Sequence, residues 1–206
     1  MNLPYWVEYG MFVRKRKPWG RKITSMDDRD ITCCFTGHRP EKMPWGSNEN
    51  DPRCRDLKYR LIEVVTSLHF SGIENFVCGM AQGGDFYFCD AVIHLRDNYP
   101  RVRLEAAIPF AGQPDRWSRD MRQRYARLLG KCDKTTVLRE DYTADCMMSR
   151  NRYMVDKSSI LVAAYNGSSG GTRNTILYAM RSDLEIVELP IETITDSRRG
   201  DYYARG

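Results

Sequence analysis

The sequence predicts an α/β protein, a Rossmann-like three-layer sandwich around a mostly parallel sheet of about six strands. Its 206 residues, 42% hydrophobic and 29% charged, are typical of one globular domain with short tails. Apolar runs of strand length alternate with helical patterns, and no internal repeat interrupts them. Strands separated by helices imply βαβ units and a parallel sheet that is covered on both faces.

The elements follow one another regularly along the chain. The strand-length apolar runs lie at 31–36, 75–78, 103–108, 134–138, 160–165 and 184–188. The segments between most of them carry apolar residues three or four positions apart, which is the spacing of one buried helical face. Such patterns occur at 57–68, 86–93, 121–129, 145–157 and 171–181. Gly72, Pro100 and Gly130 stand where the first three patterns end, as helix stop signals do.

The two ends of the chain differ from its middle. We expect residues 1–30 to be a flexible basic tail or an upstream extension, 31–192 to be the ligand-binding domain, and 193–206 to be a loose C-terminal tail. The stretch RKRKPWGRK (14–22) is either a patch for nucleic acid or another anionic surface, or a solvated tail. Met26 is a candidate natural start of the protein.

Charge and cysteine content narrow the class of function. The formal net charge is +5, of which residues 1–30 carry +3 and the remaining 176 residues only +2. A nearly neutral body argues against a broad nucleic-acid surface. No apolar stretch reaches the roughly 18 residues of a membrane span, and the N-terminus lacks the apolar core of a secretory signal. Seven cysteines without a CxxC pattern fit reduced thiols, so we expect a cytoplasmic protein.

Residues directly after the predicted strands are the candidates for a binding site, because ligands of such sheets bind beyond the carboxyl ends of the strands. Glycine loops that open helices let backbone N–H groups approach a phosphate closely. Aromatic side chains can stack on a base. The residues so placed are Gly37, His38 and Arg39; Gly79, Gly83, Gly84 and Asp85; Phe110, Arg116 and Trp117; and Gly170, Gly171 and Thr172.

Several of these candidates also have a structural interpretation. Gly79 and Gly84 have nearly the spacing of a Walker A motif, but Asp85 stands where the lysine is required, which excludes a P-loop NTPase. Asp85 is either a helix-capping residue or a partner of ribose hydroxyls. His38 is either structural or a catalytic base, and Trp117 either contacts the ligand or packs in the core. The three histidines have no metal-ligand spacing with cysteine or acidic residues, so no metal site is predicted.

Five segments together resemble a known family. They are FTGHRP (35–40), CGMAQGGD (78–85), IPFAGQPDRW (108–117), SRNRYMVDKSSILVAAYNG (149–167) and GGTRNTILYA (170–179). They are similar to the YpsA-like proteins (DUF1273) of bacteria and phages, in the SLOG superfamily with the DNA-processing protein DprA and the cytokinin-activating LOG enzymes. The resemblance implies a Rossmann-like fold with a nucleotide pocket, and it adds Gln82, Gln113, Arg150 and Asn151 to the residues that would line that pocket.

One departure from the LOG enzymes bears on catalysis. Their PGGxGTxxE motif ends in a glutamate that assists cleavage of an N-glycosidic bond, and this position is Thr175 here. Threonine cannot act as that carboxylate. We therefore expect a protein that senses or sequesters a nucleotide, NAD or an ADP-ribose-like ligand and requires no cofactor. The alternatives are a nucleotide N-glycosidase, with Asp85 or Asp115 as the acid, and a DprA-like DNA-binding protein. A homo-oligomer is left open.

Overall fold

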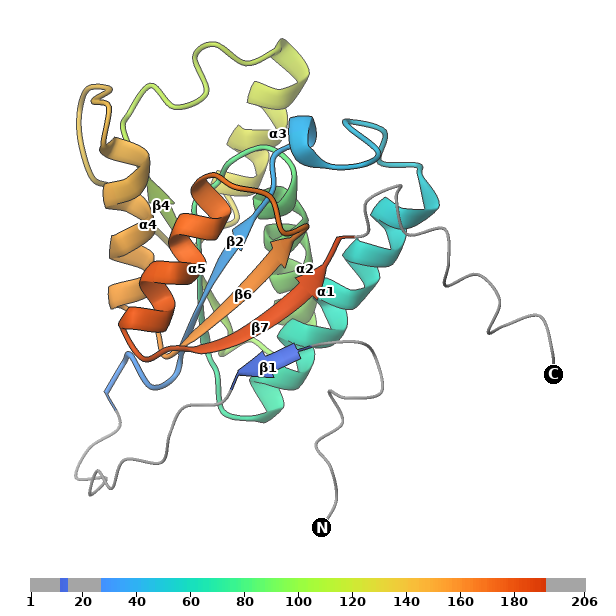
Figure 1. Cartoon of the computed structure of the whole chain (residues 1–206), viewed down its shortest axis with the longest axis vertical. Coiled ribbons are helices and arrows are strands. Elements are labelled where there is room, and N and C mark those ends of the chain that lie inside the picture. The colour runs from blue at the N-terminus through green and yellow to red at the C-terminus, as the bar shows by residue number, and fades with distance from the viewer. Residues whose placement is uncertain (1–11, 15–26, 192–206) are drawn as a thin grey trace, which may run out of the picture.

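The computed structural model describes residues 12–14 and 27–191, and within them one seven-stranded sheet lies between two layers of helices (Figure 1). The strand order is β1-β7-β6-β2-β3-β4-β5. The strands are β1 (Phe12–Arg14), β2 (Thr32–Gly37), β3 (Asn75–Cys78), β4 (Arg103–Ile108), β5 (Lys134–Val137), β6 (Ile160–Tyr165) and β7 (Glu185–Pro190). β2 to β7 are mutually parallel, which confirms the predicted fold class.

The strand that sequence analysis missed is β1. It pairs antiparallel with β7, where Val13 stands opposite Val187. The expectation that everything before residue 31 lies outside the sheet is therefore wrong at Phe12–Arg14. Three residues are too few for a recognisable alternating pattern, and the pairing partner is far away in the sequence. Residues 27–30 of the predicted tail also belong to the described body, where Arg29 donates to the carbonyls of Ser158 (2.9 Å) and Ser182 (3.1 Å). The other parts of the predicted tails, 1–11, 15–26 and 193–206, lie outside the described residues.

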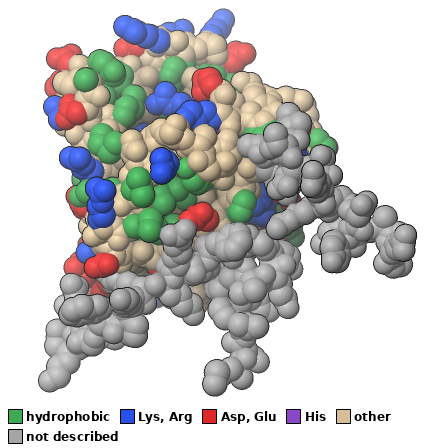
Figure 2. All heavy atoms as spheres, viewed as in Figure 1, with side chains coloured by type: hydrophobic (Ala, Val, Ile, Leu, Met, Phe, Trp, Pro, Cys, Tyr) green, Lys and Arg blue, Asp and Glu red, His purple; other side chains and the backbone are tan. Residues whose placement is uncertain are grey.

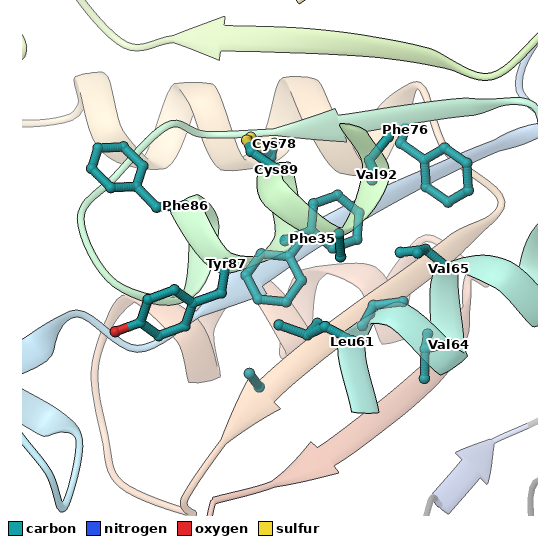
Figure 3. Packing of buried hydrophobic residues seen from close by; sticks show 14 of the residues in the cluster. Phe35, Leu61, Val64, Val65, Phe76, Cys78, Phe86, Tyr87, Cys89 and Val92 are labelled. Atoms are coloured by element: carbon teal, nitrogen blue, oxygen red, sulfur yellow. The ribbon is translucent and has the colours of Figure 1, made fainter. Parts of the chain in front are cut away.

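The helices divide between the two faces of the sheet. They are α1 (Pro52–Phe70), α2 (Gly84–Asn98), α3 (Arg119–Leu129), α4 (Cys146–Asp156) and α5 (Gly171–Arg181). Buried side chains of α1, α2 and α3 share one core cluster, and those of α4 and α5 share another. Figure 3 shows side chains of the first cluster, among them Phe35 of β2 and Phe86 and Tyr87 of α2. Phe35 also stacks on Phe88, with ring centroids 4.6 Å apart.

Capping residues and a glycine explain where α1 and α3 begin and where α1 ends. The Asp51 carboxylate accepts a hydrogen bond from the backbone N–H of Arg53 and caps α1, whose first residue is Pro52. Ser118 caps α3 in the same way through the N–H of Met121. After α1 the chain turns at Gly72, whose φ of +102° favours glycine. Along the described residues, no helix is long and apolar enough to cross a membrane.

The order of the strands places a crevice at the carboxyl ends of two neighbouring central strands, β2 and β6. The chain leaves β2 toward α1 on one face, whereas it leaves the neighbouring β6 toward α5 on the other face. The two outgoing connections therefore separate at the carboxyl ends of β2 and β6. This is the topological switch point at which open α/β sheets bind their ligands.

Candidate functional site

A cavity of about 340 Å³ lies at this switch point. Four segments line it: the end of β2 with the loop that follows, the start of α2, the middle of α4 and the start of α5. The lining residues are Phe35, Thr36, Gly37, His38, Arg39, Glu41, Lys42, Ala81, Asp85, Met147, Arg150, Asn151, Met154, Gly171 and Thr172. The cavity therefore joins residues from three of the predicted glycine or strand-end segments with the Arg150–Asn151 pair.

The lining is richer in cations than in acids. Arg39 and Lys42 are exposed, whereas Arg150 is buried. The acids are Glu41, which is exposed, and Asp85, which is buried. Three positive charges face two negative ones, an arrangement that suits an anionic ligand.

Arg150 and Asp85 form a buried ion pair in the wall of the cavity. Their Nη1 and Oδ2 atoms lie 3.7 Å apart. Burial lowers the pKa of Arg150 and raises the pKa of Asp85, and the charge of each group opposes the shift of the other. The Asp85 carboxylate also accepts a hydrogen bond from the backbone N–H of Ala81 (3.0 Å). Nη1 of Arg150, however, has no hydrogen-bond partner among the described residues.

Gly79 makes room for the Arg150 guanidinium. A Cβ atom at Gly79 would lie 1.4 Å from Nη1 of Arg150. Any side chain at this position would therefore collide with the guanidinium of Arg150. The Gln113 amide donates hydrogen bonds to the carbonyls of Gly79 (3.2 Å) and Met80 (3.1 Å) and holds this turn, in which Met80 has a φ of 54°.

The glycines at the start of α2 have a structural role that sequence analysis did not foresee. We expected their backbone N–H groups to meet a phosphate, but the N–H of Gly84 donates to the carbonyl of His38 (3.1 Å). A Cβ at Gly83 would lie 2.9 Å from the same carbonyl oxygen, and one at Gly84 would lie 3.2 Å from Cα of Gly37. These glycines let the start of α2 pack against the loop after β2. The N–H of Gly84 is thus engaged within the protein, whereas a phosphate contact of Gly83 stays a prediction.

His38 connects the two loops on either side of the crevice. Its Nε2–H donates to Oδ1 of Asn166 (2.6 Å), and its Nδ1 faces the Thr172 hydroxyl at 3.4 Å. Burial lowers the pKa of His38, which favours the neutral ring. The structural interpretation of His38 thus has direct contacts in its support.

The start of α5 presents backbone donors to the cavity. Gly170 precedes the helix with a φ of +135°, and no side chain caps the helix among the described residues. The first N–H groups of a helix have no partner within the helix and attract anions. The ammonium group of Lys42 donates to the carbonyl of Ser169 beside this terminus, and the Thr172 hydroxyl donates to the carbonyl of Gly37 (3.2 Å).

Thr175 takes part in a buried network beneath this helix terminus. Its hydroxyl donates to the carbonyl of Gly171 (2.9 Å) and accepts a hydrogen bond from Nδ2 of Asn151 (2.7 Å). Asn151 in turn accepts a hydrogen bond from Nε of Arg150 (2.8 Å). The Thr175 hydroxyl is therefore engaged within the protein.

Other predicted site residues lie outside the cavity lining. Trp117 is half-buried and packs against the core, edge-on to Phe86 and Tyr125, which supports its interpretation as a packing residue. A ligand contact of Trp117 stays a prediction. Phe110 packs edge-on against Tyr142. The remaining ones are Arg116, which is exposed, Gln82, Gln113, Gly79, Gly83, Gly84 and Gly170.

Sequence reasoning missed several lining residues. Lys42 and Glu41 follow the TGHRP segment within four residues, so their proximity to the strand end was an available signal. Met154 carried no such signal because it belongs to the buried face of α4, and the half-buried Met147 lies on the same helix, away from any strand end. Within the described residues, no group of three or more His, Cys, Asp or Glu side chains could hold a metal ion.

The fold and this crevice define a doubly wound α/β protein whose candidate site lies at the topological switch point. Within that class, the chain belongs to the YspA SLOG family, whose model (YpsA) matches residues 33–198. The resemblance noted from the sequence motifs is thereby confirmed.

Two bacterial relatives are similar to this chain in sequence, and one solved structure is similar to it in fold. The chain is 32% identical over 149 residues to the uncharacterized SPbeta prophage-derived protein YoqJ of Bacillus subtilis (strain 168), covering 65% of this chain and 86% of that protein. It is 24% identical to a UPF0398 protein of Bacillus pumilus (strain SAFR-032), covering 78% and 85%. DprA from Streptococcus pneumoniae has a similar fold, with a TM-score of 0.51 and 15% identity. That match covers 82% of this chain and about half (53%) of the DprA chain.

Proposed function

We propose that this protein binds a nucleotide or nucleotide derivative in the switch-point cavity and senses or sequesters it. The observation that carries the proposal is the buried Nη1 of Arg150, which has no hydrogen-bond partner among the described residues and belongs to a cavity-lining side chain. A buried charged donor that lacks a hydrogen bond is costly even beside the counter-charge of Asp85, and an anionic oxygen of a ligand would supply that hydrogen bond.

The other lining groups support the same class of ligand. The start of α5 and the cations Arg39 and Lys42 suit a phosphate, and Asp85 can accept a hydrogen bond from a ribose hydroxyl. A volume of about 340 Å³ is near the lower end of the usual range for ligand pockets. The enclosed part of the ligand would thus have the size of a mononucleotide, and the rest of an NAD-like or ADP-ribose-like ligand would extend toward the exposed Arg39 and Lys42.

A thermal-shift screen against mononucleotides, NAD and ADP-ribose tests the proposal. A ligand present at 100 times its dissociation constant adds about 2.7 kcal/mol of stability, which corresponds to about 5–10 °C for a domain of this size. The Arg150→Met variant should lose this shift. Arg152→Met is the matched control, because Arg152 is an exposed arginine of the same helix that lies over the Tyr178 ring. Absence of a shift with every ligand at millimolar concentration would refute the proposal.

A second candidate function is hydrolysis of a nucleotide's N-glycosidic bond. Asp85 favours it, since a buried carboxyl group with a raised pKa lines the cavity. Chromatography of each stabilising ligand after incubation with the protein separates the two functions. We expect the ligand to be recovered intact. Release of a free base by the wild type, and its loss in Asp85→Asn with unchanged affinity, would establish the enzyme.

We propose no role as a general nucleic-acid-binding protein. The similarity to DprA extends to the fold alone at 15% identity. On the face formed by α4 and α5, Figure 2 shows Lys and Arg side chains interspersed with acidic and hydrophobic ones, with no continuous basic surface in the part of the chain described. We place the protein in the bacterial cytoplasm, which the seven free cysteines support.

A further inference from the structure

Arg150 is connected to the start of α5 by a series of three hydrogen bonds, here called the Arg150–Thr175 relay. Nε of Arg150 donates to Oδ1 of Asn151 (2.8 Å), and Nδ2 of Asn151 donates to Oγ1 of Thr175 (2.7 Å). The Thr175 hydroxyl donates to the carbonyl of Gly171, the first residue of α5 (2.9 Å). Arg150, Asn151 and Thr175 are 6%, 8% and 0% exposed, so water has little access to compete for these bonds.

The relay fixes the orientation of each member. A hydroxyl has one proton, and that of Thr175 is committed to the carbonyl of Gly171, so Oγ1 is left as an acceptor toward Asn151. The Asn151 amide must therefore present its NH₂ group to Thr175 and its oxygen to Arg150. That oxygen then holds the Nε–H of Arg150 and directs the other end of the guanidinium over Gly79.

Thr175 itself does not line the cavity. A threonine hydroxyl often bonds to the carbonyl four residues earlier in a helix, so its bond to Gly171 alone requires no functional explanation. The bond to Asn151 is different, because it joins α5 to α4 across 24 positions of the sequence. It couples the helix terminus to the guanidinium, and these are the two cavity elements best suited to hold an anion.

We propose that Asn151 and Thr175 are positioning residues, which hold Arg150 so that Nη1 is available to an anionic oxygen of the ligand. This inference rests on the proposed function for its ligand, but the positioning itself is a property of the free protein. The residue at the LOG glutamate position thus acts through Arg150. Two measurements on the full-length protein test this, and only one of them needs a ligand.

The first measurement is the exchange of arginine Nε–H protons with solvent, followed by ¹⁵N–¹H NMR. The Arg150 signal is assigned by its loss in Arg150→Lys. Thr175→Val removes the hydroxyl with little change in shape, and Thr175→Ser retains it. We expect exchange at Arg150 to be about three- to tenfold faster in Thr175→Val, as for the loss of one hydrogen bond, and unchanged in Thr175→Ser. An unchanged Arg150 signal in Thr175→Val overturns the proposal. Thr175→Ala takes its place if that variant does not fold.

The second measurement is calorimetric titration with adenosine monophosphate (AMP). We expect the AMP dissociation constant to rise about three- to tenfold in Thr175→Val and to return to the wild-type value in Thr175→Ser. Urea unfolding of each variant establishes that the comparison is between folded proteins. Equal AMP affinity of the wild type and Thr175→Val overturns the ligand role of the relay. If the wild type binds neither AMP nor the other screened nucleotides, the proposed function fails, while the exchange measurement still decides whether Thr175 positions Arg150.

Discussion

Replacing Arg150 by methionine should destabilise the protein, because it leaves the Asp85 carboxylate buried without its counter-charge. The two side chains are both 7% exposed, and their charged atoms lie 3.7 Å apart. Two unit charges at that separation attract by about 4 kcal/mol at an effective dielectric constant of about 20. Removing one member of a buried pair typically costs about 3–5 kcal/mol. We expect about 3 kcal/mol here, since Asp85 can take up a proton and so limit the cost.

A double-mutant cycle isolates the interaction. Asp85→Asn removes the charge but keeps an oxygen that can accept the hydrogen bond from the N–H of Ala81. In the double variant neither charge remains, so its loss of stability should be smaller than the sum of the two single losses by about 1–3 kcal/mol. Urea unfolding of the four proteins gives the free energies. Additivity within about 0.5 kcal/mol would refute the ion pair.

The pH dependence of the Arg150→Met variant gives an independent check. Burial raises the pKa of Asp85, and the charge of Arg150 opposes this rise, so the pKa should be higher still without Arg150. A carboxyl group whose pKa is higher in the folded state binds more protons there than in the unfolded state. Stability therefore falls as the pH rises from its unfolded to its folded pKa. Because this window extends to higher pH in Arg150→Met, the variant should lose more stability at pH 8 than at pH 5. Equal losses at both pH values would contradict the assignment of the cost to Asp85.

Three further predictions concern packing around the site and the core. Gly79→Ala should displace Arg150 and weaken AMP binding in calorimetry. Gly130→Ala is the control, because the nearest atom would be 3.4 Å from its new Cβ. Wild-type AMP affinity in Gly79→Ala would contradict this role of the glycine. Six of the seven cysteines are buried, and burial raises the pKa of the Cys34 thiol to about 12. A thiol reagent at pH 8 should therefore modify at most Cys132 quickly in the folded protein, and all seven cysteines in urea. Deletion of residues 1–25 removes β1 but should leave a cooperative urea transition; loss of soluble, folded protein would show that the core needs this segment.

The sheet was predictable because its longer strands carry their own signal. Runs such as Ile160–Tyr165 are continuous apolar segments, as expected for parallel strands buried on both faces. Phe12–Arg14 carries no comparable signal, since its place in the sheet depends on the free edge of β7. The environment of the Trp117 side chain likewise depends on residues that are distant in the sequence. Trp117 lies in a polar stretch, but residues of α2 and α3 form its packing environment, and a single sequence does not show that contact.

The position of the site followed from the rule that such sheets bind ligands at their carboxyl edge, whereas its chemistry required coordinates. Gly83 and Gly84 were predicted to approach a phosphate, and the structure shows them close to the backbone of the loop after β2. The prediction that glycine is needed for a close backbone approach was correct, but the sequence did not show that another part of the backbone makes this approach. The hydrogen bond between Asn151 and Thr175 could not be predicted from the sequence either, because neither residue type indicates a partner 24 positions away.

The threonine at position 175 affects the charge of the cavity as well as its catalytic potential. The buried guanidinium of Arg150 is countered by one carboxylate in the lining, that of Asp85, which comes from α2. A glutamate in place of Thr175 would bring a second carboxylate from α5 toward the same group through Asn151. That charge would offset the positive potential available to an anionic ligand. A neutral hydroxyl can hold the Asn151 amide without adding a charge beside Arg150, so threonine leaves more positive potential in the cavity than a glutamate would.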